Sequence, residues 1–339
     1  MKAHKGNTLE YKTYGYLKVN ETDVAARESA GKEKAEGHPV FDSYIYGISP
    51  EMIQLHDNHA TLYRNLTAEG KVDLGIESVV GDEDEVITID LTVEEGGHMT
   101  GCFRSKKTGG YRSFMSRIHV KKNGVARLYF VNVDQAEVDN YLSVAAILEE
   151  GAKLDAYIFH LGDGNETSNV KCFLKGESAL GNIQSIYLGK KGQAYDFIYD
   201  MIHEGKDTTS NLIVDGALME DSYKVFKSRI DFLEGSKHSR GNEEEFAILL
   251  DSTARSISVP ALLSHEDDVE GNHAASAGRL DQDMLYYFLT RGFDAQTAER
   301  MIIDAKFAPV IDGVVYEEER KAIYEELERI MGRRDHVTR

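Results

Sequence analysis

The sequence is poor in the residues that mark several common classes of protein. Its 339 residues include two cysteines, four prolines and no tryptophan. Two cysteines, Cys102 and Cys172, are too few for a disulfide framework or for a cysteine-rich zinc site. No segment approaches the ~18 apolar residues of a membrane-spanning helix, and the N-terminus lacks the apolar stretch of a signal peptide. These absences predict a cytoplasmic protein with reduced thiols that does not enter a membrane.

Positive charge is scarce as well. The 39 Lys and Arg residues are outnumbered by 58 Asp and Glu residues, which gives a formal net charge of -19 at pH 7. A nucleic-acid-binding protein needs a basic surface to contact phosphates, so this composition argues against that class. The 41% hydrophobic and 29% charged residues are typical of a soluble globular protein, and the length allows a sizeable core.

The chain divides into three regions by pattern. Residues 1–80 are mixed and polar, with a helix predicted directly after Ser49 because Ser49 can cap it and Pro50 suits its first turn. Residues 81–277 contain short strand-like segments separated by Gly, Asp or Asn turns, without the long helical patterns of a doubly wound α/β fold. A sandwich, a barrel and a β-solenoid all satisfy this pattern. Residues 278–339 change to helical periodicity.

Three helices are predicted in the last region. Asp281 and Asp294 are good N-caps for the first two, and the third covers about 316–331. Pro309 and Gly313 are expected to break the chain between the second and third helices. Their apolar stripes favour packing against one another and against the last turn of the β region.

Histidines and carboxylates gather in two places. The segment "SHEDDVEGNH" carries His265, Asp268 and His273, and imidazole with carboxylate can bind iron, zinc or manganese. The alternative is an exposed acidic turn. In "HDNH", His56 and His59 share a helix face, which favours an exposed polar surface because a third ligand is not evident nearby.

Motifs of self-sufficient enzymes are absent. The glycines of "LGDGN" and "KTGGY" fit neither GxxxxGK[ST] nor GxGxxG, and the sequence contains neither a GxSxG elbow nor HExxH. Cys172 alternates with polar neighbours, as a buried strand residue does. Cys102 lies beside glycines and His98, and it is expected to be the more reactive thiol.

The last third of the chain resembles a known family. "ILLDSTARSISVPALLSHEDDVEGNHAASAGRLDQDMLYYFLTRGFDAQTAERMIIDAKFAPVID" and the upstream "MIHEGKDTTSNLIVDGALMEDSYKVFKSRIDFLEGS" look like the C-terminal half of the SufB/SufD scaffold proteins of iron–sulfur cluster assembly. The shared elements are a Leu-rich strand, a proline at its end, an acidic pair, a histidine followed by small residues, and an Asp-capped helix that ends in a "FLTRG" segment. The match covers about residues 200–312.

This resemblance implies a mainly β fold, a right-handed parallel β-helix with a mixed N-terminal region and a C-terminal helical subdomain. It implies a non-enzymatic scaffold that pairs with itself or with a SufB- or SufD-like subunit. The helical end would dock a SufC-type ATPase, the cysteine desulfurase system would supply sulfur indirectly, and an iron–sulfur cluster would be bound transiently.

The resemblance also implies the site residues. His273 matches the histidine proposed as a cluster ligand in SufD, while Glu245 stands where SufB has a cysteine and Gly271 where SufD often has one. Because thiolate is the usual iron–sulfur ligand, a partner's cysteine is expected to complete the site. The candidate cluster or metal ligands are His273, Glu270, Glu245 and His265. The candidate partner-binding residues are Tyr286, Arg291 and Phe293.

Two further hypotheses remain open. One is a metal-dependent β-helix enzyme acting on carbohydrate through His265, Asp268 and His273, since β-helices host many carbohydrate-active sites. The other is a cluster-free structural partner of the assembly complex, which the missing motif cysteines would allow.

Overall fold

The computed structural model describes residues 2–11, 13, 15–27, 33–35, 38–137, 139–190 and 192–332. Within them, no helix has the length and apolar content needed to span a membrane. The strands are β1 (Lys2–Gly6), β2 (Thr22–Ala26), β3 (Leu62–Ala68), β4 (Lys71–Gly81), β5 (Glu85–Val93), β6 (His98–Lys107), β7 (Arg112–Val120), β8 (Val125–Asn132), β9 (Asn140–Leu148), β10 (Lys153–His160), β11 (Glu166–Leu174), β12 (Leu180–Gly189), β13 (Ala194–His203), β14 (Thr209–Leu218), β15 (Tyr223–Phe232), β16 (Arg240–Leu249), β17 (Arg255–Ser264) and β18 (Glu270–Arg279). The α-helices are α1 (Pro50–Asn58), α2 (Gln282–Thr290), α3 (Ala295–Ile311) and α4 (Glu317–Gly332), with short 3₁₀ turns at Gly15–Leu17 and Pro39–Phe41.

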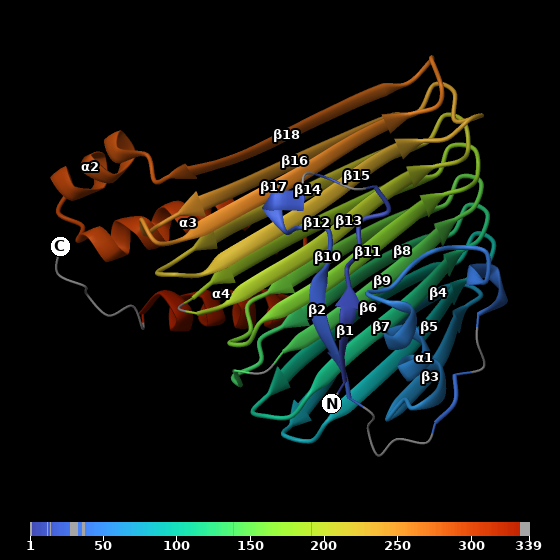
Figure 1. Cartoon of the computed structure of the whole chain (residues 1–339), viewed down its shortest axis with the longest axis horizontal. Helices are drawn as coiled ribbons and strands as arrows, with labels where there is room; N and C mark the ends of the chain where they lie inside the picture. The colour runs from blue at the N-terminus through green and yellow to red at the C-terminus, as the bar shows by residue number, and fades with distance from the viewer. Residues whose placement is uncertain are drawn as a thin grey trace.

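The chain winds into a parallel β-solenoid (Figure 1). Strands β4 to β18 with even numbers form one eight-stranded sheet, and β3 to β17 with odd numbers form the other. Each turn of the chain therefore adds one strand to each sheet, and neighbouring strands in a sheet are parallel. The parallel β-helix expected from the resemblance is confirmed. Its first strands begin at Leu62 and Lys71, inside the range assigned above to the N-terminal region.

Residues with a left-handed backbone conformation lie at equivalent positions in successive turns and form a column along the solenoid. Gly96, Asn123, Gly151, Ser178, Asp207 and His238 all have φ between 57° and 68°. The amide N–H of each donates to a carbonyl oxygen of the following turn, from Gly96 to Lys122 (3.0 Å) through to His238 to Asp268 (2.6 Å). Glycine, Asn and Asp adopt this conformation at low cost. The column recurs every 27 to 31 residues, and its hydrogen bonds fix the register of the stack.

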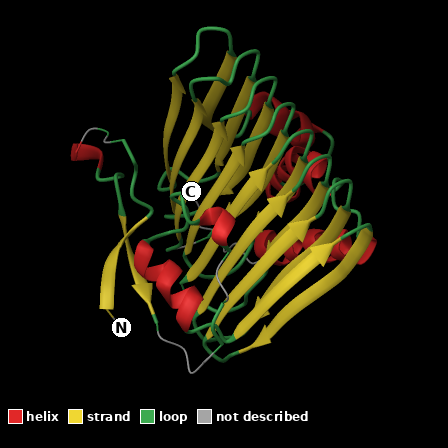
Figure 2. Ribbon diagram, turned by 90° about the vertical axis from the view of Figure 1, so that its right-hand side faces the viewer, coloured by secondary structure: helices red, strands yellow, loops and turns green. Residues whose placement is uncertain are grey.

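Different elements cover the outer faces of the two sheets (Figure 2). Helices α3 and α4 cover the outer face of the even-numbered sheet, where Ile303, Phe307 and Leu327 pack on Tyr129 and Phe159. Strands β1 and β2, helix α1 and the segment around Phe41 cover the outer face of the odd-numbered sheet. The apolar interior lies between the sheets and draws on alternate residues of the strands from β3 to β15.

Ion pairs fasten the N-terminal segment to the solenoid. Arg229 on β15 bonds Glu10 at 2.9 Å and Asp200 at 2.8 Å, and Lys171 on β11 also contacts Glu10. Buried charges are stable only when they are paired in this way.

The C-terminal helices agree with the sequence prediction except at one point. Asp281 and Asp294 cap α2 and α3 through side-chain acceptors, as predicted. Pro309 lies inside α3, which continues to Ile311, so the break comes at Gly313. Helix α3 packs against α2 and α4, as predicted, and it also contacts β12 and β14, which lie inside the stack.

Candidate functional site

Three of the four predicted cluster ligands, His265, Glu270 and His273, lie at the last turn of the solenoid, formed by β17 and β18, and Glu245 lies on the neighbouring strand β16. Strands β17 and β18 are the ends of the two sheets, so each has one edge that pairs with no other strand of the described chain. Most side chains of β18 are exposed, whereas alternate side chains of β16, its neighbour, are buried. The interior of the solenoid is therefore open at this end.

Glu245 faces the interior and is not available at the surface. Its carboxylate contacts Lys224 and accepts a hydrogen bond from the Ser258 hydroxyl at 2.5 Å. Both charged side chains have an exposed fraction of 0%. Burial lowers the pKa of Lys224, and Glu245 opposes this by favouring the charged ammonium. Glu245 is thus one half of an internal ion pair.

Glu243, which the sequence analysis did not single out, lies two residues earlier on the same face. It is 1% exposed, and its Oε1 accepts a hydrogen bond from the Ser228 hydroxyl at 2.5 Å. Its Oε2 is buried without a hydrogen-bond partner among the described residues. Burial raises the pKa of Glu243 to about 7, and the nearby Glu245 carboxylate acts in the same direction.

His273 is the direct neighbour of Glu243 across the ladder, since the two are register partners on β16 and β18. The side chain of His273 is exposed. A Cβ built on Gly271 would meet Leu262 Cδ1 at 2.4 Å and Phe232 Cε2 at 3.1 Å. Phe232 is fully buried in the interior and Leu262 lies on the last turn beside it, so positions 271 and 273, which share a face of β18, are directed toward the interior side of the strand.

The other predicted ligands do not join this group. Glu270 is exposed and pairs with Arg240 at 3.4 Å. His265 lies 3.9 Å from Asp231, and Asp268 pairs with His238 at 3.0 Å. In the described ranges, no set of three or more His, Cys, Asp and Glu side chains is gathered closely enough to hold a metal ion. The structure therefore does not assemble the three-residue site of the enzyme hypothesis.

Helix α2 and the turn that follows it carry the predicted partner-binding residues beyond the end of the stack (Figure 1). Tyr286 is 68% exposed and Phe293 is 41% exposed, and none of the residues of α2 is buried. The guanidinium of Arg291 lies 5.1 Å from the ring centre of Tyr287. An aromatic surface of this kind is typical of a protein–protein contact.

Both thiols are remote from solvent. Cys102 and Cys172 are free and fully buried. Burial raises the pKa of Cys172 to about 12 and holds the pKa of Cys102 well above its usual range. The expectation that Cys102 is the more reactive thiol is wrong, because it packs beneath the C-terminal helices.

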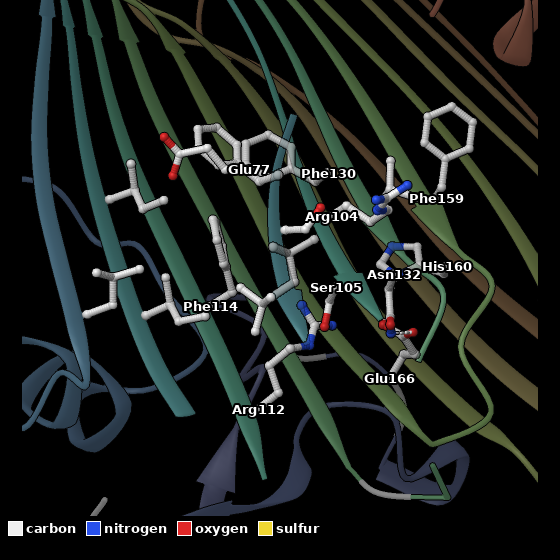
Figure 3. Close-up of a pocket in the computed structure, with 18 of the residues that line it drawn as sticks. Glu77, Arg104, Ser105, Arg112, Phe114, Phe130, Asn132, Phe159, His160 and Glu166 are labelled. Carbon is white, nitrogen blue, oxygen red and sulfur yellow. Dashed lines mark hydrogen bonds and ion pairs between the residues drawn. The ribbon is translucent and has the colours of Figure 1, made fainter. Parts of the chain in front are cut away.

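A cavity of about 360 Å³ occupies the opposite end of the interior (Figure 3). Aliphatic side chains and the rings of Phe103, Phe114 and Phe130 line it, and Arg64 pairs with Glu77 at 3.3 Å on the first turn. Its charged groups have partners inside or beside the lining: His160 contacts Glu166 at 2.9 Å, Arg112 lies 3.2 Å from Asp134, and Arg104 lies 3.0 Å from Glu319 of α4. The cavity is thus a largely apolar space whose charged groups are already paired.

Comparison with known proteins identifies the family to which the solenoid and its helices belong. The family described as "SUF system FeS cluster assembly, SufBD core domain" matches residues 86–306. The chain belongs to the SufBD family. The matched range covers the solenoid from β5 onward together with α2 and most of α3, and so includes Glu243, His273 and the exposed aromatic helix.

Individual relatives agree with this membership. The chain is 29% identical over 178 residues to the iron–sulfur cluster assembly protein SufD of Bacillus subtilis, covering 52% of this chain and 41% of the relative. It is 26% identical over 196 residues to SufB of the same organism, covering 58% and 42%. A SufBD family protein of Staphylococcus saprophyticus is 23% identical over 262 residues, covering 77% and 54%. The chain spans about half the length of these curated relatives.

Proposed function

We propose that this SufBD-family chain is a non-catalytic scaffold subunit of an iron–sulfur cluster assembly complex. The observation that carries the proposal is the position of His273, which lies on the open last turn of the solenoid within the range that matches the family. A histidine directed into an open end can meet ligands from a second subunit, which is what shared cluster assembly needs.

The second subunit would be another solenoid of this family, either a copy of this chain or a SufB- or SufD-like protein. The outer edges of β17 and β18 present backbone donors and acceptors in parallel rows, and such edges favour pairing with another strand. Pairing there would cover His273 and bring the partner's thiolates to it. The buried thiols of this chain favour a partner as the source of cysteine.

A SufC-type ATPase would dock on helix α2. The helix exposes Met284, Tyr286, Tyr287 and Leu289 on a short element beyond the stack, and aromatic residues at such a surface are the usual anchors of an interface. The sulfur would come from the cysteine desulfurase system through the partner subunits.

Co-purification with the ATPase and anaerobic reconstitution with iron and sulfide test this proposal together. We expect the full chain to retain the SufC-type ATPase, and we expect cluster absorbance to appear when a cysteine-bearing partner solenoid is present. His273→Ala should lower cluster yield while ATPase retention is unchanged. Absence of the ATPase from the complex, or a cluster yield independent of His273, would contradict the proposal.

A further inference from the structure

The cavity at the first end of the solenoid has the size of a small-molecule site (Figure 3). Its volume of about 360 Å³ is more than twice the ~150 Å³ of an apolar cavity that binds one benzene ring, and ligand pockets start at roughly 300 Å³. It lies among the first turns, at the opposite end of the stack from β17 and β18. A ligand bound there would therefore be remote from the last turn and from helix α2.

Three aromatic rings form much of the apolar lining. The ring centre of Phe103 lies 5.8 Å from that of Phe114 and 5.7 Å from that of Phe130, and the last two are 5.9 Å apart. Ile89 and Leu142 add aliphatic surface. Aromatic rings attract one another at centre-to-centre distances of about 4.5–7 Å in offset or edge-to-face arrangements. A flat ring that enters this space would thus meet surfaces that favour it.

One charged side chain of the lining has hydrogen-bond donors that are not used. Arg112 on β7 is 5% exposed. Its Nε donates to Asn140 Oδ1 at 3.1 Å and lies 3.2 Å from Asp134 Oδ2. The terminal nitrogens, Nη1 and Nη2, make no hydrogen bond within the described part of the chain, and they are not sealed from accessible space. Figure 3 shows the guanidinium beside Ser105 at the polar side of the cavity, so these donors face a ligand.

The charges around the cavity are already balanced. Each basic side chain of the lining lies beside a carboxylate, in the pairs Arg112–Asp134, His160–Glu166, Arg64–Glu77 and Arg104–Glu319. A ligand with an ionised group would therefore bring an unpaired charge into a largely apolar space, which is costly. A neutral carbonyl oxygen can accept from the unused N–H groups of Arg112 without that cost.

We propose that this cavity binds a small neutral aromatic molecule of about two fused rings that carries a carbonyl oxygen. The rings lie among Phe103, Phe114 and Phe130, and the carbonyl oxygen accepts hydrogen bonds from the terminal nitrogens of Arg112. The inference goes beyond the proposed function and does not depend on it, because the site involves neither the last turn nor helix α2.

The first turn offers a matched pair of positions for testing the site. Strand β4 is the end of its sheet, and Glu77 and Val79 on one of its faces line the cavity. Val80 faces the other way and is 65% exposed. A large side chain at position 79 therefore enters the cavity, and the same side chain at position 80 does not.

Equilibrium dialysis of the full chain against coumarin, a neutral two-ring lactone, tests the proposal. We expect saturable binding of one coumarin per chain. Naphthalene has two rings without the carbonyl oxygen, and it should bind at least about fivefold more weakly. Coumarin-3-carboxylate adds a charge and should bind at least about tenfold more weakly. Absence of saturable coumarin binding, or equal affinities for the three compounds, would overturn the inference.

Two valine variants place the binding in the cavity. Val79→Trp should weaken coumarin binding at least tenfold because the indole occupies part of the volume. Val80→Trp is the matched control, and it should change the dissociation constant less than twofold. Far-UV circular dichroism checks that both variants keep the fold. Equal losses in the two variants, or unchanged binding in Val79→Trp, would contradict a site at this position.

Arg112→Lys tests the contact with the carbonyl oxygen. Lysine keeps a positive charge beside Asp134 but lacks the terminal guanidinium nitrogens, so coumarin should bind this variant about as weakly as naphthalene does, while naphthalene binding is unchanged. Equal losses for both compounds would overturn the role of Arg112 as the donor. If the variant does not fold, the comparison of coumarin with naphthalene in the parent chain decides whether the carbonyl oxygen is recognised.

Discussion

Replacing the buried Lys224 should lower the free energy of unfolding of the last turns of the solenoid more than replacing a partly exposed lysine. Lys224 and Glu245 are both fully buried and in contact, and Ser258 is the other hydrogen-bond donor to Glu245. Lys224→Met leaves the carboxylate with the hydroxyl alone. Breaking a buried pair by removing one partner costs about 3–5 kcal/mol, because the remaining charge loses its compensation.

The double variant separates this cause from lost packing. Lys224→Met with Glu245→Gln removes both charges, and the amide can still bond Ser258. Replacing both members of a buried pair is often neutral, so we expect the double variant within about 1.5 kcal/mol of the parent. The interaction energy from the double-mutant cycle should therefore exceed about 2 kcal/mol.

Lys121→Met is the control. Lys121 bonds Glu94 at 2.8 Å, but both side chains are about one-third exposed, and pairs screened by solvent contribute about 1 kcal/mol or less. Urea denaturation followed by circular dichroism gives the free energies of unfolding, and hydrogen exchange of residues 240–264 localises the effect to the last turns. A double variant that is less stable than Lys224→Met, or equal losses in Lys224→Met and Lys121→Met, would refute the reasoning.

Three other outcomes follow from the structure. Burial lowers the pKa of His56 to about 3. Below pH 6.5 the unfolded chain therefore binds a proton at His56 that the native protein does not bind, and the free energy of unfolding falls as the pH drops from 6.5 toward 3. Between pH 7 and pH 5 this group should cost about 2 kcal/mol in urea denaturation, and His56→Gln should remove that part of the slope. Tyr286→Ala should abolish retention of the SufC-type ATPase with an unchanged melting temperature, since the side chain is 68% exposed; a lowered melting temperature would show that it packs instead. Cys102 and Cys172 should react with a thiol reagent only after unfolding, because both are buried, and rapid labelling of the native protein would contradict this burial.

The sequence was sufficient to predict where several helices begin, but not which of their side chains are buried. Ser49, Asp281 and Asp294 cap their helices as predicted, because capping depends on local chemistry alone. His56 shows the limit. The pattern favoured an exposed polar helix face, yet the structure buries the imidazole between the hydroxyls of Thr88 at 2.9 Å and Ser113 at 2.8 Å. Those partners are 32 and 57 residues away, and local spacing contains no information about them.

Glu243 was missed for a related reason. Three consecutive glutamates, 243 to 245, do not indicate in the sequence which face each side chain occupies, and the resemblance to the family singled out Glu245 alone. In a strand, however, the middle residue faces the opposite side from its neighbours, so a buried pair and an exposed member are concealed in a uniform run. Alternation of this kind becomes visible only when the register with β18 and the position of the interior are known.

The missing sequence repeat has a physical explanation. Solenoids usually reveal a period, yet this chain repeats a backbone conformation and not a residue. The turn column is occupied in order by Gly, Asn, Gly, Ser, Asp and His, all with positive φ, and each amide serves the next turn through its backbone N–H. Because a backbone donor is present in every one of these residues, the turn hydrogen bond requires a left-handed conformation but no particular side chain. Ser178 has a φ of 59°, and Ser178→Gly should stabilise the solenoid by relieving a left-handed conformation that costs about 1–2 kcal/mol. His238 is not equivalent, because its imidazole lies 3.3 Å from Asp207 and 3.0 Å from Asp268. At Gly151, where glycine already stands, the opposite change is expected to have the opposite effect. Gly151→Ala should destabilise the solenoid, since a Cβ there would lie 2.3 Å from Asn123 Oδ1. Opposite shifts in melting temperature for Ser178→Gly and Gly151→Ala, at equivalent positions of two turns, would show that this position requires a left-handed backbone and not a common residue.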